Sequence, residues 1–154
     1  MPTPSRPRLI ERRFTQSIAA PRTAVHPLLC PERECDWLPG WSYRMIRSES
    51  GLAELGAVFA TPYPSGGESI WIVTRHYVPT GVGFIRLQPD GLLVEIEIDL
   101  RPDGADRCFV DILYRYTAVS EVGEVALATL ASAQWQTTME HWEGAMNRWF
   151  ALAA

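Results

Sequence analysis

Residues 135–149, WQTTMEHWEGAMNRW, decide the fold of this chain, because large apolar side chains recur in them at helical spacing. The recurring residues, at steps of four, three, four and three positions, are Trp135, Met139, Trp142, Met146 and Trp149. Side chains three and four positions apart lie on one face of an α-helix. The segment therefore predicts a long C-terminal helix that buries one apolar stripe, and Ser120 has a suitable side chain for its N-cap.

Most of the preceding chain has the pattern of β-strands joined by turns. From about Gly40 to Thr117, short apolar and alternating runs are interrupted by glycine and proline. The segment from Leu9 to Ala19 also alternates, and two short helices divided near Cys30 are expected after it. This order predicts an α+β fold. In it, a curved, seven-stranded antiparallel sheet wraps the long C-terminal helix, and the two short helices lie between the first and second strands.

The turn at Asp90-Gly91 sets the register of the best-defined hairpin. A two-residue turn at this dipeptide places Arg86 opposite Glu95 and Ile85 opposite Ile96. We therefore expect Arg86 on the charged face of the sheet, away from the core.

The next turn requires a longer loop. A five-residue loop over residues 102–106 places Ile96 opposite Ile112 on the buried face. The same register sets Glu97 opposite Asp111 on the solvent face, which is a small repulsion.

The length and composition are typical of one globular domain. The chain has 154 residues, of which 47% are hydrophobic and 21% charged. Three prolines lie in residues 1–8, which we expect to be a disordered tail before one domain over residues 9–154. No apolar run reaches the length of a membrane span and the N-terminus has no apolar signal core, so we expect a cytoplasmic protein.

The charge pattern argues against nucleic acid as a partner. The chain has 14 basic residues, all arginine, and 18 acidic residues, for a net charge of −4. Affinity for nucleic acid comes mostly from neutralising phosphates, so a mildly acidic domain is a poor candidate. Glu11 interrupts the arginines of residues 6–13, which we interpret as a tail and a solvated strand face.

The cysteines and histidines indicate neither a disulfide framework nor a metal centre. Cys30, Cys35 and Cys108 are odd in number and are expected to be free thiols. The spacing of His26, Cys30, Glu32 and Cys35 fits no standard zinc site. We expect no metal and no cofactor.

Several segments in this order resemble the START and pollen-allergen helix-grip superfamily, also called SRPBCC, and more closely its bacterial polyketide cyclase/dehydrase-like members. The matching segments are Ile18–Pro21, Glu34–Trp41, Gly56–Phe59, Ile70–Thr74, Tyr114–Ala118 and Trp142-Glu143. The resemblance covers Leu9 to Leu152 and implies the helix-grip fold. It does not single out an activity, because the superfamily includes lipid carriers, cyclases, hydrolases and chaperone co-activators, and no catalytic signature of one branch matches.

The final helix also predicts where a cavity lies. The side chains of Ala126–Ala133 are small, whereas those of Trp142–Trp149 are bulky. We therefore expect a cavity beneath the first segment, closed by the tryptophans of the second. The expected ligand-binding residues are Tyr43, Phe59, Trp71, Arg75, His76, Ile96, Ile112, Tyr114, Tyr116, Leu130, Ala131 and Met139.

Arg75 and His76 are alternatives for a polar group in this cavity. They are adjacent near the end of one strand, so only one points inward, and the following loop permits either parity. An inward Arg75 is a ligand anchor or a paired cation, and an inward His76 is a candidate acid or base.

The favoured function is the binding of a small hydrophobic molecule, such as a lipid, a polyketide or an aromatic metabolite, because the inward residues are almost all apolar. An enzyme of the cyclase, dehydratase or hydrolase type that uses the same pocket is the alternative. A chaperone co-activator-like interaction domain is a third, and a homodimer is compatible with each.

Overall fold

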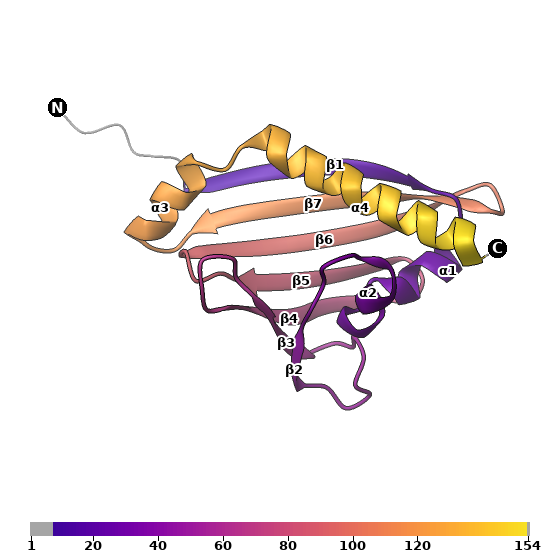
Figure 1. The fold of residues 1–154 in the computed structure, drawn as a ribbon, viewed down its shortest axis with the longest axis horizontal. Helices are drawn as coiled ribbons and strands as arrows, with labels where there is room; N and C mark the ends of the chain where they lie inside the picture. The colour runs from indigo at the N-terminus through magenta and orange to yellow at the C-terminus, as the bar shows by residue number, and fades with distance from the viewer. Residues whose placement is uncertain (1–7, 154) are drawn as a thin grey trace.

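The computed structural model describes residues 8–153, and in them seven antiparallel strands form one sheet with helices on one face (Figure 1). The elements in chain order are β1 (Leu9–Ile18), α1 (Arg22–Val25), η1 (His26–Leu28), α2 (Pro31–Trp37), β2 (Arg44–Arg47), β3 (Val58–Pro62), β4 (Glu68–Tyr77), β5 (Gly81–Leu87), β6 (Leu92–Asp103), β7 (Arg107–Ala118), α3 (Glu121–Ala128) and α4 (Ser132–Ala153). The strand order is β1-β7-β6-β5-β4-β3-β2. The predicted fold class is confirmed, and the expected tail lies outside the described residues except for Arg8.

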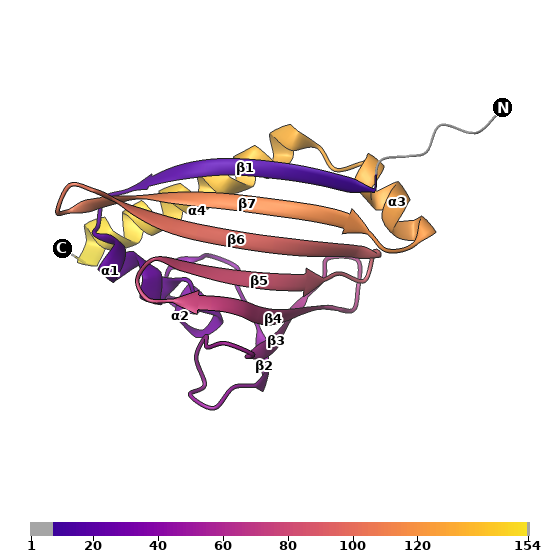
Figure 2. The ribbon, with the colours of Figure 1, turned by 180° about the vertical axis from the view of Figure 1, so that it is seen from behind.

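Helix α4 crosses the sheet diagonally, with α1 and α2 near its C-terminal end and α3 beyond its N-terminal end (Figure 1). Figure 2 shows the opposite face of the sheet, which no helix of the described chain covers. The predicted stripe of α4 faces the sheet. Trp135, Met139, Trp142 and Met146 are buried, and Trp149 is partly buried.

Hydrogen bonds from polar side chains also join α4 to the region of β1, which is an edge strand of the sheet. The Gln16 side-chain amide donates to the Met139 carbonyl at 3.0 Å. The Glu143 carboxylate accepts from Ser17 N at 2.6 Å. Asn147 accepts from Ala19 N at 2.8 Å through Oδ1 and donates to the Ser17 carbonyl at 3.0 Å through Nδ2. These bonds satisfy backbone groups that an exposed edge strand leaves open.

The expected single helix from Ser120 is divided into α3 and α4. Ser120 does cap α3, because its Oγ accepts from Gly123 N at 3.1 Å. Gly123 lies so close to the Gly91 carbonyl that an added Cβ would be 2.0 Å from that oxygen, which holds α3 at the end of the sheet. Helix α4 instead packs its apolar stripe across the strands. One straight helix cannot make both this contact and the contact of Gly123 with Gly91. Arg12 Nη2 donates to the Leu130 carbonyl at the break.

The predicted register of the β5–β6 hairpin is wrong by one residue. Arg86 lies opposite Val94, and Ile85 opposite Glu95. The loop has three residues, Pro89-Asp90-Gly91, and Gln88 N donates to the Leu92 carbonyl across it. Proline favours the first central position of a type I turn, and Gly91 supplies the left-handed residue that follows, with φ +81°. A slip of one residue moves Arg86 from the solvent face to the face beneath α4.

The β6–β7 hairpin keeps the predicted faces but is displaced by two residues. Ile96 lies opposite Tyr114, not Ile112, so inward residues remain inward. Asp99, not Glu97, lies opposite Asp111. The repulsion is relieved because Arg75 bonds Asp99 and Arg101 bonds Asp111.

Candidate ligand-binding site

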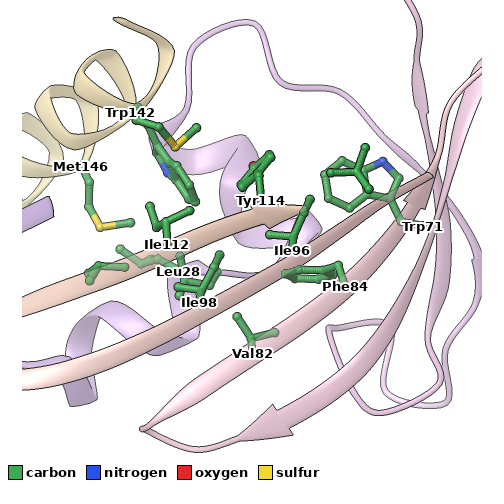
Figure 3. Packing of buried hydrophobic residues seen from close by; sticks show 14 of the residues in the cluster. Leu28, Trp71, Val82, Phe84, Ile96, Ile98, Ile112, Tyr114, Trp142 and Met146 are labelled. Atoms are coloured by element: carbon green, nitrogen blue, oxygen red, sulfur yellow. The ribbon is translucent and has the colours of Figure 1, made fainter. Parts of the chain in front are cut away.

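A cavity of about 170 Å³ lies between the sheet and α4. Its lining is mostly aromatic and aliphatic, and the residues are Glu34, Leu38, Trp41, Phe59, Trp71, Phe84, Arg86, Ile96, Ile98, Tyr114, Thr138, Met139, His141 and Trp142. In Figure 3, Phe84, Ile96 and Ile98 rise from β5 and β6, while Trp142 projects from α4 toward the sheet.

The floor of the cavity is built by inward positions of three neighbouring strands. Phe59 of β3 and Trp71 of β4 are directly paired, and their rings stack with centroids 5.2 Å apart. Phe84 of β5 meets Trp71 edge-on at 5.7 Å. Trp71 is fixed further because its Nε1 donates to Thr61 Oγ1 at 3.0 Å. This part of the wall is therefore rigid and apolar.

Helix α2 and the loop after it close one side of the cavity. Trp37 stacks on Trp142 with ring centroids 5.8 Å apart, and its Nε1 donates to the Leu28 carbonyl at 3.0 Å. Trp41 lines the cavity and donates through Nε1 to the Pro31 carbonyl at 2.9 Å. These two bonds hold the indoles in place without using any group that points into the cavity.

Arg86 brings a positive charge into this apolar space. Its Cζ lies 5.0 Å from the Trp71 ring centroid and 5.7 Å from the Tyr114 ring centroid. Its Nε is buried without a hydrogen-bond acceptor, and no ion pair among residues 8–153 includes it. A guanidinium held over two rings gains cation–π attraction, but its Nε–H is left without an acceptor.

Glu34 is the carboxyl group in the cavity wall. It lies on α2, three positions before Trp37 and four before Leu38, so it shares their inward face. Desolvation by burial raises the pKa of Glu34 to about 8. The carboxyl group is therefore mainly protonated at neutral pH and donates a hydrogen bond more readily than it attracts a cation. The spacing of Glu34 to Trp37 and Leu38 is present in the sequence. Helical periodicity over this short segment is the signal that would have predicted Glu34 as a cavity residue.

Two more open hollows continue from the cavity along α4, of about 290 and 320 Å³. Both include Arg86, Leu130 and Ala131 in their walls, so Arg86 stands where the three spaces meet. These two hollows lie at the predicted place beneath Ala126–Ala133, whereas the cavity of about 170 Å³ lies farther along α4. Trp142 stacks on Trp37 and forms a wall of this cavity.

Neither a protein-family model nor a curated protein matches this sequence. Solved structures do match. A norcoclaurine synthase point mutant from Thalictrum flavum, in complex with a transition state analogue, has a TM-score of 0.68 and 13% identity, over 95% of this chain and 97% of the other. Major latex-like protein 151 from Panax ginseng has a TM-score of 0.70 and 12% identity, over 92% and 97%. A protein from Mesorhizobium loti has a TM-score of 0.62 and 14% identity, over 90% and 98%.

This protein has the helix-grip fold. The resemblance stated from the sequence is confirmed at the level of the fold, which is what likeness at these identities establishes.

The helix-grip cavity brings together some of the predicted ligand-binding residues. Phe59, Trp71, Ile96, Tyr114 and Met139 line it. A second group lines the adjoining hollows, namely Tyr116, Leu130 and Ala131.

Four other predicted residues, Tyr43, Arg75, His76 and Ile112, are absent from the lining of this cavity. Ile112 is buried in the core, and Tyr43 packs edge-on against Phe59 while its hydroxyl bonds Glu32. Arg75 lies on the outer face, where Nε donates to Glu97 and Nη1 donates to Asp99, each at 2.8 Å.

His76 faces inward but reaches a different hollow, of about 220 Å³, at the end of β4. A register shift between Val73 and Arg75 sets this parity, which the sequence left open. The ring lies 5.2 Å from that of His26, whose Nε2–H donates to the Gly81 carbonyl at 2.9 Å. Burial, with His26 nearby, lowers the pKa of His76.

Among the described residues, the three cysteines are free, with Cys30 and Cys108 buried and Cys35 exposed. Within residues 8–153, no group of three metal-ligating side chains is close enough to hold an ion. None of the helices in this range is both long and apolar enough to cross a membrane.

Proposed function

We propose that this helix-grip domain binds a small, largely apolar molecule with an aromatic ring in the cavity beneath α4. The observation that carries the proposal is the cavity itself, of about 170 Å³, with indole and phenyl rings in its walls. Ligand pockets are commonly mostly apolar, with few polar groups that fix orientation. Here the polar side chains are Arg86, Glu34, Thr138 and His141, of which Arg86 carries the positive charge.

The size of the cavity supports a ligand built on one or two rings. An apolar cavity of about 150 Å³ accommodates benzene. A second ring or substituent extends past Arg86 into the adjoining hollow of about 290 Å³. A norcoclaurine synthase from Thalictrum flavum with the same fold has been solved in complex with dopamine and hydroxybenzaldehyde, each of which has one aromatic ring.

The test is calorimetric titration with 2-naphthamide, a neutral two-ring probe. We expect a Kd on the order of 100 µM for the wild-type protein, from typical ligand efficiencies. Ile96→Phe fills the cavity from β6 and is expected to abolish binding. Ile85→Phe makes the same change on the outer face of β5 and should leave the affinity unchanged. Failure of the wild-type protein to bind, or equal binding by Ile96→Phe, contradicts the proposal.

A second candidate function is an enzyme that moves a proton in the same pocket. It is favoured by Glu34, whose raised pKa of about 8 suits a general acid or base near neutral pH. Proton transfer at a carbon next to a carbonyl is a step in cyclisation and dehydration. The test is deuterium exchange into 2-tetralone in heavy water, followed by NMR. Exchange that is faster with wild type than with Glu34→Gln supports an enzyme, and equal rates leave binding as the function.

A further inference from the structure

We propose that the ligand is an aromatic carboxylate whose carboxylate group binds the guanidinium of Arg86. The inference rests on the proposed binding function and adds the charge of the ligand and the residue that recognises it. It follows from three features of the cavity: a guanidinium without an ion pair, two rings that orient it, and carboxyl groups that do not bond it.

Arg86 is inward because of the three-residue turn, and there the side chain is partly buried, with its Nε fully buried and without an acceptor. A buried guanidinium without a carboxylate or carbonyl partner loses hydration that nothing returns. Other arginines of the sheet have such partners. Arg75 bonds Glu97 and Asp99, and Arg101 bonds Asp111. Arg86 alone among these three faces the cavity, with Nε unsatisfied.

The aromatic neighbours orient the group for a planar anion. Trp71 and Tyr114 hold the guanidinium at ring-centroid distances of 5.0 and 5.7 Å. The Tyr114 and Tyr116 hydroxyls also lie beside the guanidinium, and neither of them is an anion. The buried Nε–H has no acceptor, and a guanidinium edge that includes it matches the two oxygens of a carboxylate. A ring that carries the carboxylate then packs among Phe84, Trp71 and Trp142, which line the same space.

The acidic groups that share these spaces with Arg86 do not form an ion pair with it. Asp90 shares a hollow with Arg86, but its carboxylate accepts from the Tyr63 hydroxyl at 2.6 Å and from Gln88. Glu34, across the cavity, is mainly protonated at neutral pH, as argued above. Arg12, another cation beneath the helices, donates to the Leu130 carbonyl, and its Nε is unsatisfied. No carboxylate of residues 8–153 therefore forms an ion pair with Arg86, and its guanidinium remains available to the anion of a ligand.

The experiment compares 2-naphthoate with 2-naphthamide, which have nearly the same shape and differ in charge. Both are titrated calorimetrically at pH 7 and constant salt. A hydrogen bond to a charged group is worth about ten- to a hundredfold in affinity, so we expect the wild-type protein to prefer the carboxylate by at least about tenfold. Arg86→Met should remove this preference and still bind the amide. Arg115→Met, which removes an exposed arginine on the other face of the sheet, should retain the preference.

The outcomes separate the anchor from the cavity. Equal affinity of the wild-type protein for the two probes overturns the anchor and leaves the proposed function standing. No binding of either probe overturns both. A preference that persists in Arg86→Met assigns the anion to another residue and overturns the proposal. The wild-type ratio needs no variant, and Arg86→Lys, which keeps the charge, should retain part of the preference if Arg86→Met does not fold.

Discussion

The indole rings of Trp37 and Trp142 stack nearly parallel, at an interplanar angle of 10° and a centroid distance of 5.8 Å. The contact joins α2 to α4. In the sequence, strands β2 to β7 lie between these two helices. Because Trp142 also lines the cavity, the same contact stabilises the fold and closes one side of the candidate site.

Trp142→Ala should therefore destabilise the protein by about 3–5 kcal/mol, since it removes a buried indole and leaves a void. Urea unfolding followed by circular dichroism measures the change. Trp149→Ala is the matched control on the same helix, where the indole is only partly buried, and a cost of about 1 kcal/mol is expected. Equal losses at the two positions would show that the stack with Trp37 adds nothing.

The turn that directs Arg86 inward depends on Gly91. Its φ is +81°, and an added Cβ would lie 2.2 Å from Ser120 Oγ and 2.8 Å from Gly123 N. We expect Gly91→Ala to cost about 3 kcal/mol, from left-handed strain and from overpacking. Gly51→Ala has the same strain, with φ +77° and nothing within 4 Å, and should cost about 1 kcal/mol. The difference between the two unfolding free energies measures the contact with α3.

The sequence predicted the parts of the fold that periodicity encodes. Alternation identified Leu9–Ala19 as a strand, and the structure has β1 over Leu9–Ile18. Helical spacing identified the buried stripe of α4, because each residue on that face is large and apolar. The periodicity of apolar residues shows which face of a helix or strand is buried. This information was sufficient to predict the two layers of the fold and the order of their elements.

The candidate site was predicted only in part, because its polar residues depend on details between elements. Arg86 was assigned to the wrong face since Asp90-Gly91 fits a two-residue turn, and only Pro89 distinguishes the three-residue loop that forms. The inward parity of His76 follows from a register shift between Val73 and Arg75, which no local pattern indicated. The aromatic wall, by contrast, followed from strand alternation at Phe59 and Trp71.

Asn147 provides a test of how the edge of β1 is covered. Asn147→Leu leaves the Ala19 N–H and the Ser17 carbonyl without their partners, and we expect a cost of about 2 kcal/mol. Arg148→Leu changes the neighbouring exposed residue and should alter the unfolding free energy by less than about 0.5 kcal/mol. Urea unfolding of both variants measures the two changes in unfolding free energy. An unchanged value for Asn147→Leu would mean that water replaces both hydrogen bonds at no cost in stability.

Glu34 predicts a dependence of stability on pH. Its folded pKa of about 8 lies above the ordinary value of 4.5, so the folded state keeps a proton that the unfolded state loses. Stability contributed by the protonated group is present at low pH and is lost as pH rises from 4.5 through 8. Arg86, Tyr114 and His141 also face this cavity and are unchanged in Glu34→Gln.

Glu34→Gln removes this titration. The unfolding free energy of the variant should therefore rise relative to that of the wild-type protein as pH rises. One pKa unit corresponds to about 1.4 kcal/mol, and with the partial exposure of Glu34 we expect a relative gain of about 2 kcal/mol between pH 5 and pH 8.5. Glu140→Gln, which changes an exposed carboxylate of α4, should follow the wild-type protein at both pH values. Urea unfolding at the two pH values measures the difference. Parallel curves for Glu34→Gln and the wild-type protein would mean that Glu34 is ionised at neutral pH, and Arg86 would then face an anion of the protein's own.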